Sequence, residues 1–215
     1  GKGLFLGNIS GVPPTEIVVI GSDKIAESAA LTATRLGARV KVFSNSIFKL
    51  NKIQKLIGNP IYSSTIQKKQ LTKALMRCDV AIGTIKSSTS SESVITEDMV
   101  IKMKKGSIII DVSIDTGGTF QTSELTNHDK PTFVKHDVIH YCVPNIPSRY
   151  SRTSSLCLSN IITPYLVKSV RFGSFENFIR NNNSFKKGVY LYNGLNTNMI
   201  ISQILGIKSV SYTHL

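Results

Sequence analysis

Two polar residues late in the chain follow apolar, strand-like runs and carry side chains that could act on a bound ligand. Asp115 lies in the segment Ser-Ile-Asp-Thr-Gly-Gly, just past residues 107–112, and the glycines after it allow backbone to come close to a ligand. A carboxylate there can orient a bound group or move a proton, or it can bond N–H groups of its own loop. Asn145 follows residues 138–143 and offers both a hydrogen-bond donor and an acceptor.

A strand–helix–strand pattern near the start of the chain indicates what kind of ligand these residues face. Residues 17–20 form a β-branched run that ends at Gly21, a helical period continues to residue 36, and residues 40–43 form a second apolar strand. This is one βαβ unit. The N-terminus of its helix can hold the pyrophosphate of a dinucleotide through free N–H groups and the helix dipole.

Two positions depart from the glycine fingerprint of such units. Gly21 and Ala26 fit the pattern G-x-G-x-x-G/A, but Asp23 occupies the place of its second glycine. Ser44 occupies the place of the acid that holds the ribose hydroxyls. A carboxylate about 4 Å from a phosphate charge costs on the order of 4 kcal/mol at an effective dielectric of about 20, unless it points away or Lys24 neutralises it.

Strand and helix patterns alternate through about residue 147, which predicts an α/β fold with an open, doubly wound, mostly parallel sheet of the Rossmann type. Ligands bind beyond the carboxyl ends of the strands in such a sheet, so the loops that matter are 21–26, 83–86 and 113–118. The remaining strand-like runs are 3–7, 61–64 and 80–83, the remaining helical ones are 47–57, 71–78 and 96–103, and residues 86–93 form a polar loop.

The pattern changes beyond Pro147, where a helical C-terminal tail is expected. Residues 153–168 are typical of a helix that Pro164 kinks or restarts, and 175–179 and 197–205 are shorter helical patterns. The tail has too few apolar residues for a core of its own, so we expect it to pack on something else. We therefore predict a division into residues 1–147 and 148–215.

Composition narrows the class of protein. An apolar fraction of 41% in 215 residues indicates a globular chain, and no run of about 18 apolar residues is present to span a membrane. Neither the three cysteines nor the four histidines have metal-ligand spacing, so we expect reduced thiols, no metal site and a cytoplasmic protein. His140 alternates with its neighbours in a strand-like run, which favours packing over chemistry.

The net charge of +13 leaves a polyanionic partner open. Residues 28–78 contain ten Lys or Arg and no acid. Lys49, Lys52 and Lys55 recur at helical spacing opposite an apolar stripe, which favours an ordinary solvated face. A basic nucleic-acid or partner-binding module stays the alternative from another class, although the aromatic residues of a single-strand binder are absent there.

Three blocks of sequence closely resemble the C-terminal two-thirds of alanine dehydrogenase. They are residues 1–21, residues 96–133 (which contain SIDTGG) and residues 140–166 (HYCVPNIPSRYSRTSSLCLSNIITPYL). The resemblance covers roughly residues 1–207. The related proton-translocating transhydrogenase subunit shares the architecture, but SIDTGG and HYCVPNIP followed by RTSS are more similar to the dehydrogenase.

The resemblance implies interconversion of L-alanine with pyruvate and ammonia, using NAD, in a cytoplasmic homo-hexamer. It makes residues 1–147 the NAD domain, and the tail part of a substrate domain whose N-terminal part is absent. It places the catalytic aspartate on Asp115 and the nicotinamide-side asparagine on Asn145. The full set of implied cofactor contacts is Gly21, Lys24, Ile25, Ser44, Lys49, Ile85, Lys86, Ile114, Asp115, Val143, Asn145 and Ile146.

Departures from the family leave alternatives open. The family's substrate-gripping arginine, lysine and histidine lie in an N-terminal segment that this chain lacks, so we expect the 215 residues alone to be catalytically silent. Ser44 removes a repulsion against a 2′-phosphate, and Lys49 lies nearby, so some tolerance of NADP is a hypothesis. With Asp23 as well, the rival within the fold is a degenerate Rossmann domain that binds nucleotide weakly or not at all.

Overall fold

The computed structural model describes residues 2–85 and 93–210, apart from the side chain of residue 204. The chain forms two compact units, Gly1–Arg149 and Tyr150–Leu215. Of the predicted polar loop 86–93, only Ser93 lies inside the described residues.

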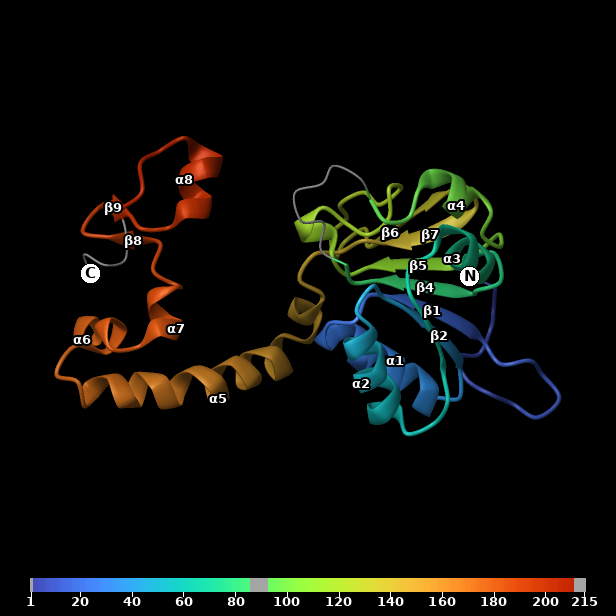
Figure 1. Ribbon diagram of the computed structural model, residues 1–215, viewed down its shortest axis with the longest axis horizontal. Coiled ribbons are helices and arrows are strands. Elements are labelled where there is room, and N and C mark those ends of the chain that lie inside the picture. The colour runs from blue at the N-terminus through green and yellow to red at the C-terminus, as the bar shows by residue number, and fades with distance from the viewer. Residues whose placement is uncertain (1, 86–92, 211–215) are drawn as a thin grey trace. The chain divides into compact units, whose positions relative to one another are not determined.

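The first unit is built on one seven-stranded sheet with the strand order β3-β2-β1-β4-β5-β7-β6 (Figure 1). All neighbours pair in parallel except β6 and β7, which form an antiparallel hairpin at one edge. Its strands are β1 (Glu16–Ile20), β2 (Arg39–Phe43), β3 (Tyr62–Ser64), β4 (Val80–Gly83), β5 (Ile108–Asp111), β6 (Thr132–Lys135) and β7 (Val138–Tyr141). This is the predicted open, mostly parallel α/β sheet.

Helices cover both faces of the sheet, as a doubly wound fold requires. The helices are α1 (Lys24–Arg35), α2 (Ile47–Ile57), α3 (Lys68–Leu75) and α4 (Glu97–Ile101). One apolar core joins α1 and α2 to one face, with Val19 and Ile53 fully buried. The other core joins α3 and α4 to the opposite face around Ile20, Leu75 and Ile109, and Figure 1 shows the two helix pairs on opposite sides of the strands.

Six of the strands confirm the predicted runs to within two residues, and two expectations fail at the ends of the sheet. Residues 3–7 form no strand in the described chain: residues 3–6 are exposed and irregular, and the bridge between Ile9 and Val12 closes the separate turn that follows. The sequence pattern missed β6, whose four residues follow Pro131 and alternate between exposed and half-buried. Such a short edge strand carries little apolar signal.

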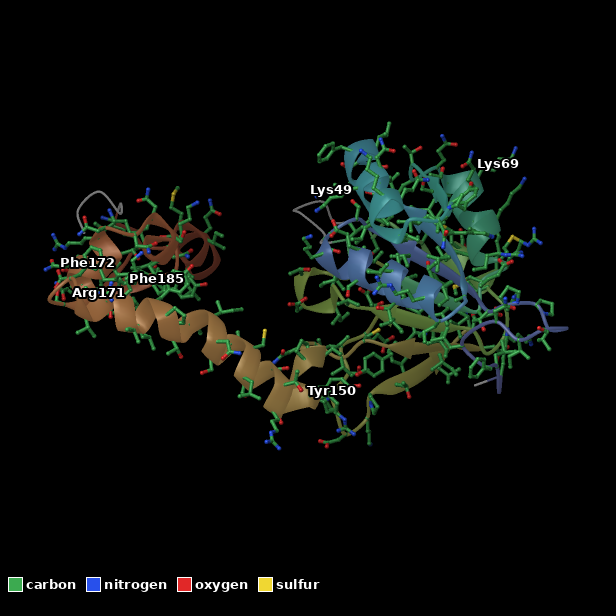
Figure 2. The ribbon with its side chains drawn as sticks, turned by 90° about the horizontal axis from the view of Figure 1, so that it is seen from below. Lys49, Lys69, Tyr150, Arg171, Phe172 and Phe185 are labelled. Carbon is green, nitrogen blue, oxygen red and sulfur yellow. The ribbon has the colours of Figure 1, made fainter. Side chains whose placement is uncertain are left out.

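The second unit begins with α5 (Ser151–Val170), which runs through Pro164 without a restart. It continues with α6 (Phe175–Arg180), α7 (Asn183–Lys186), the two-stranded β8 (Leu191–Tyr192) and β9 (Leu195–Asn196), and α8 (Met199–Leu205). Its small core is aromatic: the ring of the fully buried Phe178 lies 5.6 Å from that of Phe172 and 5.0 Å from that of Phe185. Figure 2 labels Phe172 and Phe185. Most large apolar side chains of α5 are exposed.

No helix in the described part of the chain is long and apolar enough to cross a bilayer.

Candidate functional site

The carboxyl ends of β1, β2, β4, β5 and β7 meet at one edge of the sheet. The chain leaves β1 toward β2 on one side and later returns to β4 on the other, so the strand order reverses between β1 and β4. Register keeps the ends level, since Ile20 pairs with Gly83 and Gly83 pairs with Asp111. Ligands of open α/β sheets bind at such a reversal.

The turn from β1 to α1 has a special backbone at Gly21. Its φ is +133°, and a Cβ there would lie 2.1 Å from Thr84 Oγ1, so only glycine fits against the start of the β4 loop. At the next bend Asp23 is the N-cap of α1, and its Oδ1 accepts from Ala26 N at 2.9 Å. The carboxylate therefore points at the helix N-terminus, where a pyrophosphate would bind.

Two donors at this N-terminus stay available despite Asp23. The backbone N–H groups of Lys24 and Ile25 have no acceptor among the residues that the structure describes. The Lys24 ammonium does not neutralise Asp23, because its Nζ lies 2.7 Å from Glu27 Oε2. Hydrogen bonds from Lys24 and Lys52 hold the pKa of Glu27 below its usual value.

The end of β2 carries hydroxyls in place of an acid. Ser44 is almost fully buried, and its Oγ lies 2.6 Å from Ser22 Oγ and 3.2 Å from Ser46 N. Ser46 in turn caps α2 by accepting from Lys49 N. The exposed Lys49 side chain stands in the first turn of α2, so a group that reaches this corner meets hydroxyls and a cation.

Asp111, the last residue of β5, is fully buried and accepts five hydrogen bonds from neutral donors. Ser113 supplies its N–H at 3.2 Å and its hydroxyl at 2.9 Å to Oδ1. Oδ2 accepts from Thr119 N at 2.8 Å, Phe120 N at 3.2 Å and Ser123 Oγ at 2.7 Å. The sequence analysis missed this residue because it ends an apolar strand and its partners follow later in the chain.

Asp115 lies in the loop whose two ends are hydrogen-bonded to Asp111. A single 3₁₀ turn, η1 (Ile114–Thr116), exposes the Asp115 carboxylate and leaves Ile114 half-buried. Gly117 and Gly118 follow with φ of +99° and +72°, conformations that other residues rarely adopt. Asp115 is thus held at the edge of the sheet with its carboxylate free to meet a ligand.

The segment after β7 completes the edge. Val143 is buried, while Asn145 is exposed with a φ of +52° and opens the 3₁₀ turn η2 (Ile146–Tyr150). His140 is packed inside β7 as predicted, fully buried between Thr122 Oγ1 at 2.8 Å and Val138 O at 3.0 Å. Burial lowers its pKa.

The structure brings the predicted site residues to one edge of the sheet, on the loops that follow β1, β2, β4, β5 and β7. Lys86 alone lies outside the described residues, although Ile85 beside it is described and bonds Thr119. Sequence reasoning missed Ser22, Asp111 and Thr119. Ser22 and Thr119 are polar residues within a turn and a loop, where composition alone predicts nothing specific.

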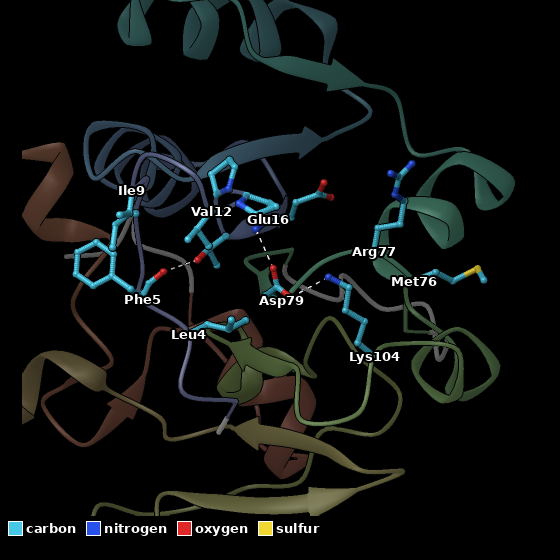
Figure 3. Close-up of a pocket in the computed structure, with 13 residues that line it drawn as sticks. Leu4, Phe5, Ile9, Val12, Glu16, Met76, Arg77, Asp79 and Lys104 are labelled. Carbon is cyan, nitrogen blue, oxygen red and sulfur yellow. Dashed lines mark hydrogen bonds and ion pairs between the residues drawn. The ribbon is translucent and has the colours of Figure 1, made fainter.

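A hollow of about 520 Å³ lies at the opposite, amino-terminal edge of the sheet (Figure 3). Apolar side chains of the N-terminal segment line one side of it, and Asp79 is among the polar residues that line it. Asp79 Oδ2 accepts from Glu16 N at 3.0 Å, and its Oδ1 lies 2.8 Å from Lys104 Nζ. None of the predicted site residues lines it, so it is separate from the edge described above.

The basic residues between 28 and 78 are partly paired. Arg39 and Lys41 contact Glu16 at 3.5 and 3.1 Å, and Lys52 contacts Glu27 at 3.0 Å. Lys49 on α2 and Lys69 on α3, labelled in Figure 2, are exposed. Because α2 and α3 cover opposite faces of the sheet, Lys49 and Lys69 do not belong to the exposed face of a single helix.

The residues at this edge of the sheet could bind a dinucleotide, except that one negative charge opposes its phosphates. Free N–H groups at α1, the hydroxyl pair at Ser44 and the glycine turn after Asp115 all leave room and polarity for such a ligand. The conflict is the Asp23 carboxylate, which stands at the same helix terminus as the free N–H groups. Among the described residues, no three His, Cys, Asp or Glu side chains cluster as metal ligands do.

Known proteins resemble this chain over most of its length. The C-terminal domain model of alanine dehydrogenase/PNT matches residues 1–199. Alanine dehydrogenase 2 of Staphylococcus aureus (strain USA300) is 34% identical over 205 residues, which are 94% of this chain and 55% of that protein. The chain thus spans about half the length of this relative.

Solved structures show the same likeness. An L-alanine dehydrogenase superposes with a TM-score of 0.88 at 28% identity, over 96% of this chain and 57% of that one. A transhydrogenase from Sinorhizobium meliloti shares the fold, with a TM-score of 0.65 at 20% identity over 79% of this chain and 47% of that one. The chain therefore belongs to the alanine dehydrogenase/PNT family.

Proposed function

We propose that this chain is the NAD-binding part of an alanine dehydrogenase, which oxidises L-alanine to pyruvate and ammonia. The observation that carries the proposal is the arrangement of the exposed Asp115 and Asn145 at the same edge of the sheet as the free N–H groups of α1. The family match supports the substrate. A cytoplasmic homo-hexamer is part of the same proposal and rests only on what the family resemblance implies.

The residues of this chain act on the cofactor side. The N–H groups of Lys24 and Ile25 hold the pyrophosphate, and the Ser22–Ser44 pair faces the adenosine ribose. Asp115 and Asn145 orient the nicotinamide end, and Asp115 can hold a proton beside it. Bound NAD would supply the hydride acceptor.

Residues 148–215 have a separate role in the proposal. Their large apolar side chains on α5 stay exposed in the second unit, which supports packing against a further segment of a substrate domain. The relative aligned over half its length has the extra sequence for such a domain. We expect the 215 residues alone to bind the cofactor without oxidising alanine.

A titration of the purified chain with NADH, following reduced-nicotinamide fluorescence, tests the proposal. We expect saturable enhancement in the wild type that NAD displaces, and weaker binding in Asn145→Ala. Asn127→Ala, an asparagine in the loop before β6, is the matched control. Absence of any saturable signal would favour the degenerate domain that Asp23 makes the second candidate.

The same titration with NADPH addresses the identity of the dinucleotide. Ser44 and the exposed Lys49 offer no negative charge to a 2′-phosphate, and this supports binding of both nucleotides. An NADPH affinity far below that of NADH would restrict the proposal to NAD.

A further inference from the structure

Asp111 closes the loop that carries Asp115 at both of its ends. Ser113, at the start of the loop, and Thr119, Phe120 and Ser123, at its end, all donate to one carboxylate. The residues between them form an arch that is joined to the protein through these bonds. A fully buried carboxylate without such donors would be strongly unfavourable, so the carboxylate and the closed arch depend on each other.

Two glycines show how tightly the arch is fitted. A Cβ on Gly118 would lie 3.0 Å from Asp111 Oδ2, at a φ of +72°. A Cβ on Gly83 would lie 2.5 Å from Thr119 Cβ. Thr119 therefore crosses directly over the end of β4, and Gly118 sits against the carboxylate.

Thr119 extends the network to the neighbouring loop. Its Oγ1 accepts from Ile85 N at 3.2 Å and lies 3.2 Å from Ile85 O and 2.9 Å from Ser113 Oγ. The Ser113 hydroxyl proton goes to Asp111, so the Thr119 hydroxyl proton goes to Ser113 or to Ile85 O. One buried carboxylate thus fixes the loops after both β4 and β5.

We propose that Asp111 is the positioning residue for the nicotinamide end of the cofactor, acting through Thr119 on Ile85 and through the arch on Asp115. The proposal rests on the proposed function. Asp111 touches no ligand in it. Its effect is to hold the loops after β4 and β5 in the geometry that favours NADH over ADP-ribose, which lacks the nicotinamide.

Isothermal titration with NADH and with ADP-ribose separates positioning from general stability, because ADP-ribose lacks the nicotinamide. In Asp111→Asn we expect NADH affinity to fall roughly tenfold, while ADP-ribose affinity changes less than about threefold. Thr119→Val, which removes only the hydroxyl, should give a smaller change in the same direction. Asp79→Asn is the control, since Asp79 is likewise a hydrogen-bonded acid, although only partly buried and paired with Lys104, and it lies at the amino-terminal edge.

An unchanged ratio of NADH to ADP-ribose affinity in Asp111→Asn overturns the proposal, as does an equal loss of ratio in Asp79→Asn. If the wild type binds neither compound, the proposed function fails by itself. Amide hydrogen exchange of the free protein then decides the positioning role. Faster exchange in Asp111→Asn around residue 85 and residues 113–120, with β1 and β2 unchanged, supports it, and unchanged exchange there overturns it.

Thr119→Val carries the same tests if Asp111→Asn does not fold. Loss of the Thr119 hydroxyl leaves all five bonds to Asp111 possible and removes the contacts of that hydroxyl with Ile85 and with Ser113 Oγ. A fall in the NADH to ADP-ribose ratio, or faster exchange around residue 85, supports the proposal. No change in either measurement overturns it.

Discussion

The two halves of the carboxyl edge of the sheet are built in different ways. At β1 and β2, the side chains that depart from the dinucleotide fingerprint are only partly buried or hydroxyl-bearing, and each bonds within its own turn or the next. At β4 and β5, five bonds to one fully buried carboxylate close the loop after β5, and the Thr119 hydroxyl links that loop to Ile85 after β4. In the proposed function, the departures fall in the half that would hold phosphate and adenosine, and the loop closed by Asp111 lies in the half that would hold nicotinamide.

The difference suggests which half has room to change. Ser44 and Asp23 can be replaced without disturbing a buried charge, so substitutions there should alter affinity more than stability. Asp111 cannot be replaced in that way, because its donors would be left unsatisfied. Variants at Ser44 and Asp23 should therefore change affinity with little loss of stability, whereas variants at Asp111 should lower stability as well as affinity.

The largest expected effect is on folding, in the half at β4 and β5. Asp111→Ala leaves several buried donors without an acceptor and should lower the free energy of unfolding by about 3–5 kcal/mol. Asp115→Ala, on the same loop but exposed, should stay within about 0.5 kcal/mol of the wild type. Urea unfolding of both variants measures the difference. Equal losses would remove the distinction between the buried frame and the exposed acid.

The next effect is on cofactor choice, in the half at β1 and β2. Ser44→Asp restores an acid that bonds ribose hydroxyls and repels a 2′-phosphate, so NADPH should weaken roughly thirtyfold relative to NADH. The free energy of unfolding should change far less than in Asp111→Ala. Parallel fluorescence titrations with the two nucleotides measure the ratio. A ratio that does not move would show that Ser44 does not face the ribose.

A smaller change is expected at Asp23. Asp23→Asn keeps a good helix cap and removes one negative charge near the pyrophosphate, so ADP-ribose and NADH should both bind about fivefold more tightly. Asp98→Asn, which neutralises an exposed acid in the first turn of α4, is the control and should change neither affinity. Equal binding by wild type and Asp23→Asn would mean that the carboxylate does not oppose the phosphates.

The smallest effect concerns pH and the packing of β7. Burial lowers the pKa of His140 from its usual value of 6.5, so below pH 6.5 the unfolded chain binds this proton before the folded chain does. The stabilising contribution of neutral His140 is therefore present above pH 6.5 and is lost as the pH falls toward the folded pKa. His140→Gln should show a flatter decline between pH 7 and 5 in thermal unfolding. Parallel declines would show that His140 does not titrate in this way.

Much of the fold was predictable because its strands are short apolar runs bounded by glycine and polar turns. β1, α1 and β2 were found from period and composition alone, and so was the buried β5. β6 was not, because a four-residue edge strand beside Pro131 resembles a loop in composition. Residues 3–7 were apolar enough to resemble a strand, yet no neighbouring strand pairs with them in the described chain.

The sequence predicted which residue types occur in the candidate site but not the directions in which their side chains point. The sequence places Asp23 and Ser44 in the fingerprint, but not the bond from Ala26 N to Asp23 or the contact of Ser44 with Ser22. Asp111 was hidden at the end of an apolar run, since its five bonds depend on how a loop folds back. Side-chain direction in turns is set by tertiary contacts that local patterns do not contain.

The most direct test of this account is the affinity of the wild-type chain for NADH and for ADP-ribose, measured side by side by isothermal titration. If the loops after β4 and β5 hold the nicotinamide as proposed, both compounds should bind and NADH should bind roughly tenfold more tightly. Equal affinities would contradict the claim that the β4 and β5 loops recognise nicotinamide. Binding of neither compound would contradict the claim that this edge is a dinucleotide site.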